Sequence, residues 1–182
     1  KEKMISGTQE QENEDQQEKG QESCVDDESD LYLKKAMSAG FLKALFKYSM
    51  RLKNEDERNE TNQNEAKWKE LLKISSDGGY PKAIYHYATL LEEEEPEKST
   101  NNEIINLYKH SADFGCKESM YKYGLKMFNI SSDVSGKRES LFYLKKAGDK
   151  GLIEAIYKYA KILIEGDIGI QSNVKEGSKY LH

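Results

Sequence analysis

One six-residue pattern is written four times in this chain, and it constrains the fold more than any other feature. The copies begin at successive intervals of 39, 36 and 36 residues, and they read ALFKYS from Ala44, AIYHYA from Ala83, SMYKYG from Ser119 and AIYKYA from Ala155. A period in this range is typical of a solenoid, in which similar units stack side by side. The repetition therefore predicts an array of repeats whose function is carried by a surface and not by a chemical site.

A second block recurs before each of these copies and ends on a glycine. The blocks read YLKKAMSAG, LLKISSDGG, LYKHSADFG and YLKKAGDKG, and their final residues are Gly40, Gly79, Gly115 and Gly151. Apolar and small residues spaced by three and four form one stripe of a helix, and glycine favours the left-handed position that ends a helix. With 34% charged residues and two prolines, the chain is predicted to be an all-α solenoid of about four antiparallel helix pairs.

Helical phase separates buried from exposed positions in the Ala-containing helices. Counting the first Ala or Ser as position 0, positions 0, 1, 4, 5 and 8 share one face, as in Ala83, Ile84, Tyr87, Ala88 and Leu91. The small residues at positions 0 and 5 permit close helix approach. Position 4 is always tyrosine, and we expect packing side chains whose hydroxyls reach a partner, not an aromatic binding stripe, at Tyr48, Tyr87, Tyr123 and Tyr159.

Polar stretches are predicted to connect the two helices of each repeat. They read NEDERNETNQ, EEEEPEKSTN, NISSDVSG and GDIGIQSN in chain order. Asn102, Asp133 or Ser135, and Asn173 stand near the predicted starts of the second helices, where side-chain oxygens can accept from free backbone amides. The Gly166-Asp167-Ile168-Gly169 segment lacks the lysine and the preceding strand of a phosphate-binding loop, and we interpret it as a turn.

The charge is divided unevenly along the chain. The net charge of −5 combines −8 over residues 1–30 with +3 over residues 31–182. Residues 1–30 are predicted to be an acidic, mostly disordered segment, or the end of an earlier repeat followed by a long acidic loop. Residues 31–182 are predicted to be the repeat array, with its last repeat truncated. A body this close to neutral is not typical of a dedicated nucleic-acid binder.

Residues with catalytic or metal-binding chemistry are few and scattered. Cys24 and Cys116 have no neighbouring cysteine, and His86, His110 and His182 fall on different helical phases without a nucleophile beside them. We expect no enzyme activity, no cofactor and no metal. No apolar run is long enough to span a membrane. We expect a cytoplasmic protein, with the endoplasmic-reticulum lumen or secretion as alternatives.

The last copy resembles the Sel-one-like repeat (SLR) family, relatives of the tetratricopeptide repeats. The matching residues of AIYKYAKILIEGDIGIQSNVKEGSKYLH are Ala155, Ala160, Leu163, Gly166, Gly169, Asn173, Gly177, Tyr180 and Leu181. The other copies are looser, and the resemblance extends over about residues 31–182. It implies a right-handed superhelix of antiparallel helix pairs that acts as a scaffold or adaptor in multiprotein complexes.

Position 3 of the Ala-containing helices is predicted by phase to face water, and it is the candidate partner-binding column. It carries Lys47, His86, Lys122 and Lys158, and Arg51 and Lys126 follow one turn later. Stacking of repeats would align these side chains on the surface lined by the first helices, where we expect an acidic peptide of a partner to bind. An ordinary solvated face is the alternative. The acidic residues 8–29 are a second candidate occupant, as an autoinhibitory segment.

The sequence leaves two alternatives to a protein-interaction scaffold. The chain is either a protein-interaction scaffold or the regulatory or substrate-docking part of a larger enzyme, such as a kinase, whose catalytic domain lies elsewhere. A purely structural array is the third reading, in which the column packs against another copy of the chain as a homo-oligomer.

Overall fold

The structure is a computed structural model that describes Leu31 and residues 35–94, 96–98, 102–167 and 169–181. Within these ranges the regular elements are helical, and a lone β-bridge joins Asp167 to Ile170. The helices are α2 (Leu42–Asn59), α3 (Glu65–Asp77), α4 (Pro81–Glu94), the 3-10 helix η1 (Pro96–Lys98), α5 (Asn102–Asp113), α6 (Lys117–Ile130), α7 (Val134–Asp149), α8 (Ile153–Glu165) and α9 (Val174–Lys179). The predicted all-helical class is confirmed. The acidic segment 1–30 lies outside the described residues.

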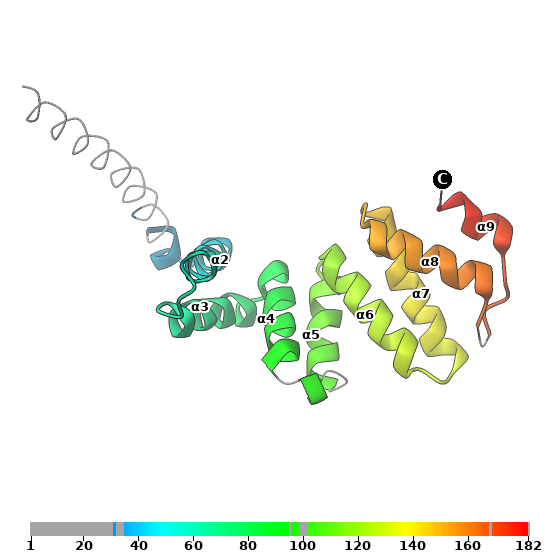
Figure 1. The fold of residues 1–182 in the computed structure, drawn as a ribbon, viewed down its shortest axis with the longest axis horizontal. Helices are drawn as coiled ribbons and strands as arrows, with labels where there is room; N and C mark the ends of the chain where they lie inside the picture. The colour runs from blue at the N-terminus through cyan, green and yellow to red at the C-terminus, as the bar shows by residue number, and fades with distance from the viewer. Residues whose placement is uncertain (1–30, 32–34, 95, 99–101, 168, 182) are drawn as a thin grey trace, which may run out of the picture.

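The helices form an array of pairs, as the repeats predict. We call α2, α4, α6 and α8 the A-helices, because they carry the four copies of the six-residue pattern, and α3, α5, α7 and α9 the B-helices. Each helix packs mainly against the helices directly before and after it in the chain. Figure 1 shows the row running from α2 at one end to α9 at the other, with the C-terminus at the α9 end. The predicted solenoid of four helix pairs is confirmed.

A glycine reverses the chain shortly before each of the four A-helices. Gly40, Gly79, Gly115 and Gly151 all have positive φ, between 77° and 93°. In each case the glycine amide donates to the carbonyl three residues earlier, for example from Gly79 to Ser76 at 2.9 Å. This left-handed conformation costs other L-residues free energy, so the glycine that recurs in the sequence has a backbone reason.

The predicted core face of the A-helices is confirmed. At position 0, Ala83, Ser119 and Ala155 are fully buried, and the small residues at position 5, Ser49, Ala88 and Ala160, are too. At the same position in α6, a side chain on Gly124 would come within 2.9 Å of Leu144, so the absence of one allows α7 to pack closely. Three of the four tyrosines at position 4 are buried, namely Tyr48, Tyr123 and Tyr159, and Tyr87 is partly buried.

Serine hydroxyls join the two helices inside the first two pairs. Ser75 of α3 donates to the carbonyl of Leu42 at 2.8 Å, and Ser111 of α5 donates to the carbonyl of Pro81 at 2.7 Å. Leu42 and Pro81 are the first residues of their A-helices. Each buried serine hydroxyl thereby finds an acceptor for its hydrogen. The unpaired backbone groups at the start of a helix are amides and not carbonyls, so these hydrogen bonds satisfy the serines and do not cap the A-helices.

The polar connections are shorter than predicted. The stretch NEDERNETNQ was expected to be a loop, but its first six residues continue α2 to Asn59. Asp56 in this stretch is buried, and its carboxylate accepts from the Asn64 amide at 3.0 Å, which fixes the turn into α3. Charged residues such as Glu, Lys and Arg are good helix formers, so a polar composition does not end a helix.

Two predicted helix caps are confirmed. Asp133 accepts from the backbone amides of Ser135 and Gly136 at the start of α7, and Asn173 accepts from the amide of Glu176 at the start of α9. Asn102 is the first residue of α5. Asp167 and Ile170 pair across the predicted turn in a β-bridge, and the Asp167 carboxylate forms a 3.1 Å ion pair with Lys137 of α7.

Candidate functional site

The six predicted binding residues lie on the A-helices, but they are not equally exposed. We call the surface formed by Lys47, Arg51, His86, Lys122, Lys126 and Lys158 the A-helix face. Lys47 is exposed, and the other five side chains are partly buried. At position 3, Lys47 is exposed to water as predicted, whereas His86, Lys122 and Lys158 are only partly exposed. The structural reason is that each of the other position 3 side chains meets the A-helix of the preceding repeat.

A regular contact places these side chains at the junctions between consecutive A-helices. Position 3 of one A-helix lies against position 9 of the A-helix before it. Lys122 forms an ion pair with Glu92 at 3.4 Å, and the Lys158 ammonium lies 5.6 Å from the centre of the Phe128 ring. His86 and Lys53 line the same small cavity. The position 3 side chains of α4, α6 and α8 therefore lie beside three different kinds of group at position 9: the cation Lys53, the carboxylate Glu92 and the aromatic ring of Phe128.

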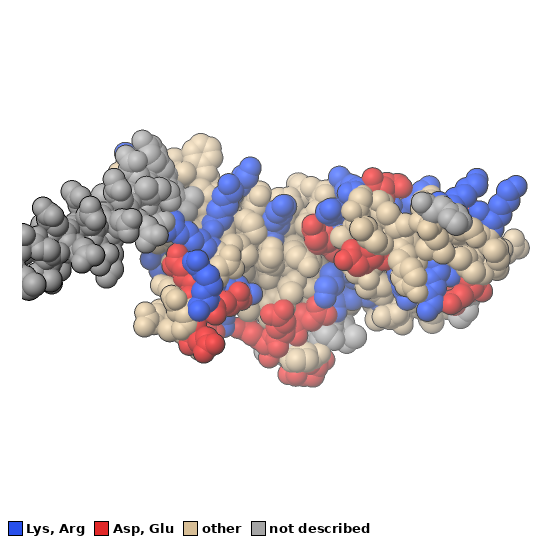
Figure 2. Space-filling view, turned by 45° about the horizontal axis from the view of Figure 1, so that its top comes forward, with Lys and Arg blue, Asp and Glu red and all other residues tan. Residues whose placement is uncertain are grey.

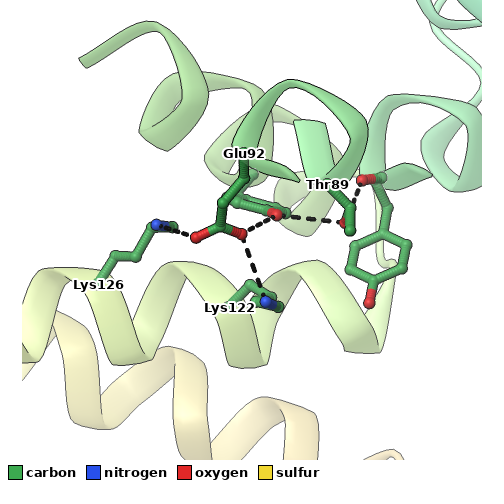
Figure 3. Close-up of polar contacts among 6 residues, drawn as sticks. Thr89, Glu92, Lys122 and Lys126 are labelled. Atoms are coloured by element: carbon green, nitrogen blue, oxygen red, sulfur yellow. Dashed lines mark hydrogen bonds and ion pairs between the residues drawn. The ribbon is translucent and has the colours of Figure 1, made fainter. Parts of the chain in front are cut away.

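Glu92 is the centre of a polar network at the junction of α4, α5 and α6. Its carboxylate accepts from Lys126 at 2.6 Å and from the Tyr108 hydroxyl at 2.9 Å, besides the ion pair with Lys122 (Figure 3). Thr89 lies 3.2 Å from the same tyrosine oxygen. The contacts bridge two repeats, because Glu92 belongs to one A-helix and the two lysines to the next.

This network exists because one buried position is occupied by tyrosine. Leu72, Tyr108 and Leu144 occupy the same place in successive B-helix blocks, and at most 1% of each is exposed. A leucine there needs no polar partner, whereas a buried phenol does. Glu92 and Thr89 supply that partner, and the lysines of α6 then neutralise the carboxylate.

The surroundings of the network keep the Glu92 carboxylate ionised and the Tyr108 hydroxyl protonated. Burial by itself would raise the pKa of Glu92, but the hydrogen bonds from Lys126 and Tyr108 and the charge of Lys122 hold it below its usual value. Burial raises the pKa of the Tyr108 hydroxyl, so this group stays a donor. Lys122 and Lys126 already pair with the Glu92 carboxylate, so they are poorer candidates than an unpaired lysine for binding an acidic partner.

His86 is a packed side chain and not a member of an exposed column. Its ring lies 5.2 Å from the Phe46 ring and 5.1 Å from the Tyr85 ring. Burial lowers the pKa of His86, and the positive charge of Lys53 lowers it further, while Glu118 acts in the opposite direction. The cavity beside it has a volume of about 30 Å³, on the scale of one water molecule.

The B-helix side holds contacts that the sequence did not reveal. Glu139 of α7 accepts from Lys109 of α5 and from the hydroxyl of Tyr123, both at 2.9 Å, and the Tyr143 hydroxyl donates to Asp113 at 2.5 Å. The hydroxyl of Tyr123 thus reaches a partner, as expected for the tyrosines at position 4. The pairing of Lys109 with Glu139 joins residues 30 positions apart, and only alignment of successive repeats could have suggested it.

The cysteines and histidines named in the sequence analysis do not come together in the described residues. No cluster of three or more His, Cys, Asp or Glu in the described ranges could hold a metal ion. The Cys116 thiol is buried and donates to Glu118 at 3.2 Å, and His110 stacks against Phe114 at 5.0 Å. Cys24 and His182 lie outside the part that the structure describes. Among the described helices, none is long and apolar enough to cross a membrane.

Two solved structures share this arrangement of helices. One is a protective antigen present in uropathogenic Escherichia coli strains that displays an SLR fold, with a TM-score of 0.67 at 19% sequence identity over 83% of this chain. The chain has the SLR fold. The second SLR-fold structure is a Sel1 repeat protein from Oxalobacter formigenes, with a TM-score of 0.63 at 19% identity over 82% of this chain. The resemblance predicted from the last repeat is thereby confirmed for the fold.

The matches cover only part of those proteins. This chain spans 32% of the Escherichia coli antigen and 59% of the Oxalobacter formigenes protein. No protein-family model matches the sequence, and a search of curated proteins gave no match. The SLR fold is therefore established by the arrangement of the helices.

Proposed function

We propose that the array is a non-catalytic, cytoplasmic scaffold that binds a segment of a partner protein on the A-helix face. SLR-fold arrays present extended surfaces made of side chains from successive repeats, which suits contacts distributed along a partner. The observation that carries the proposal is that Lys47 and Lys158 are not neutralised by a neighbouring carboxylate. These two end members of the column have no carboxylate partner among the described residues, unlike Arg51, Lys122 and Lys126.

The location of these two lysines supports a surface role. Lys47 lies on α2 and Lys158 on α8, so they mark the two ends of the described A-helix face. The centre of the face is occupied by the Glu92 network and by the packed ring of His86. A partner that uses positive charge would therefore contact the ends of the face more strongly than its centre.

Charge reversal at two matched pairs of lysines tests this proposal. Lys47→Glu with Lys158→Glu changes the A-helix face, and Lys73→Glu with Lys145→Glu changes exposed lysines of the B-helices by the same total charge. Lys122 and Lys126 are left intact, because a new carboxylate beside Glu92 would damage the fold. We expect capture of partners on the immobilised full chain to be lost with the first pair and kept with the second. Equal capture by both variants would contradict the proposal.

A further inference from the structure

Helix α2 carries Lys47 of the A-helix face and one further exposed cation, Arg58. Lys47 and Arg58 of this helix are exposed, and neither forms an ion pair with the residues that the structure describes. Arg51 lies between them and pairs with Glu55 of its own helix at 3.0 Å. On α6, by contrast, Glu92 holds both lysines of the face. Lys47 in the second turn of α2 and Arg58 in its last turn are therefore available to a partner, as is Lys158 of α8.

A groove with an apolar floor runs along the same side of α2. Its volume is about 800 Å³, and Phe46 and Met50 contribute apolar surface to it, while Lys47, Arg51 and Arg58 contribute cations. Glu57 also lines the groove, but its carboxylate pairs with Lys53 at 3.7 Å. The groove thus combines an apolar centre with cations near both ends. Figure 2 shows acidic side chains gathered where α4 meets α5, and others beside the cations at the α2 and α3 end of the row.

We propose that this groove binds an acidic segment of a partner protein that carries an apolar side chain near its middle. The inference rests on the proposed function and names the partner's chemistry. Charge complementarity selects an acidic occupant, and the partly buried thioether side chain of Met50 suits an adaptable apolar contact through the part that remains accessible. Neutral polar or basic segments would meet the cations of α2 without compensation.

The length of the groove limits the length of the bound segment. Arg58 follows Lys47 by three turns of α2, and at a rise of 1.5 Å per residue this is about 16 Å. An extended peptide covers about 3.3 Å per residue, so about five residues bridge the two cations. The segment would place an acidic residue near each end and its apolar residue over Met50.

Fluorescence anisotropy with labelled five-residue probes tests the proposal on the full chain. The first probe is Glu-Glu-Phe-Glu-Glu, the second has Ser in place of Phe, and the third is Lys-Lys-Phe-Lys-Lys. We expect the first probe to bind most tightly at low salt and to weaken as salt rises, because exposed charges are screened. Equal binding of the first and third probes would overturn the proposal.

Variants locate the binding site of the probe. Lys47→Glu with Arg58→Glu should weaken binding of the first probe by about tenfold, the size expected for two exposed ion pairs. Met50→Ala should weaken the Phe probe and leave the Ser probe unchanged. Lys73→Glu with Lys145→Glu, on the B-helices, should leave binding of both unchanged. Loss of affinity in this control equal to that in the α2 variant would overturn the assignment to α2.

Two further outcomes separate this inference from the proposed function. If captured partners depend on Lys158 but not on Lys47 and Arg58, the scaffold proposal stands and the α2 groove is wrong. If the probe binds only after the Asp and Glu residues of the segment 8–29 are replaced by Asn and Gln, the groove is occupied by the chain's own acidic segment. That result would overturn the choice of a separate partner protein.

Discussion

At the scale of single residues, the array is made specific by polar side chains that differ from repeat to repeat. Position 9 of the A-helices carries Lys53, Glu92 and Phe128 in successive repeats, and each faces the base at position 3 of the next A-helix. The positions that repeat define the stack, and the positions that vary distinguish one junction from another. The junction around Glu92 holds two ion pairs and a hydrogen bond from the Tyr108 hydroxyl.

Removing the buried hydroxyl of Tyr108 should weaken that junction. Tyr108→Phe keeps the ring and deletes the donor to Glu92, so we expect a loss of about 1 kcal/mol in the free energy of unfolding. Tyr157→Phe is the control, because Tyr157 is 59% exposed, and it should change little. Urea unfolding of both variants gives the comparison. Equal stability of the Tyr108 variant and the wild type would show that the hydrogen bond contributes nothing.

His86 should make stability depend on pH. Its folded pKa lies below the usual value, mainly because of burial, so the unfolded chain takes up its proton first as the pH falls. The free energy of unfolding should therefore fall between about pH 7.5 and pH 5.5, around the unfolded pKa of about 6.5. His86→Gln should remove this part of the pH dependence, and His110→Gln, at an exposed position, should keep it. Identical pH profiles for the two variants in urea unfolding would refute this account.

Sequence reasoning predicted the buried residues of the A-helices better than the charged ones. Positions 0 and 5 are buried in every copy and position 4 in three of the four, so phase alone identified Ala83, Ser119 and Tyr123. The environment of a base at position 3 depends on a side chain 30 residues earlier, as with Lys122 and Glu92. A helical wheel drawn for one helix cannot contain that neighbour, which is why His86 was expected in water.

At the scale of helices, the turns were predictable and the helix lengths were not. Glycine at the end of each B-helix block indicated a left-handed residue, and the four positive φ angles confirm it. The end of α2 was missed because its last turns are charged, and nothing in the composition of NEDERN opposes a helix. The buried carboxylate of Asp56, which orders the following turn, requires knowledge of where α3 begins.

Gly79 offers a clean test of the turn geometry. Its φ is +90°, and an added Cβ would have no heavy atom within 4 Å, so any cost of a substitution comes from the backbone. Gly79→Ala should lower the free energy of unfolding by about 1–2 kcal/mol, the cost of a left-handed L-residue. Gly79→Asn should cost less, because asparagine tolerates this conformation better. Urea unfolding that ranks alanine equal to glycine would contradict the assignment.

At the scale of the whole molecule, the array is a chain of neighbour contacts. Each helix packs mainly on its neighbours in sequence, so no single core joins α2 to α9 (Figure 1). The SLR fold was predictable because its repeat is written in the sequence, and the comparison with solved structures agrees. The acidic segment 1–30 lies outside the described residues, and its predicted role as an autoinhibitory segment stays a prediction.

Damage to one repeat should therefore remain local. Leu72 is 1% exposed and packs between α2, α3 and α4, and Leu72→Ala should remove about 2–5 kcal/mol of packing. Hydrogen–deuterium exchange should rise in those three helices and stay unchanged in α7 and α8. Exchange that rises equally along the array would show a single cooperative unit, contrary to the neighbour-contact description.

Site-specific photo-cross-linking tests the central claim, that the A-helix face binds a partner, most directly. A photoreactive side chain is placed singly at Lys47, Lys158, Lys73 or Lys145 of the full chain, and the products are separated after capture of partners. The account predicts cross-linked partner from positions 47 and 158 on the A-helices and none from positions 73 and 145 on the B-helices. Cross-links from the B-helix positions alone would contradict it.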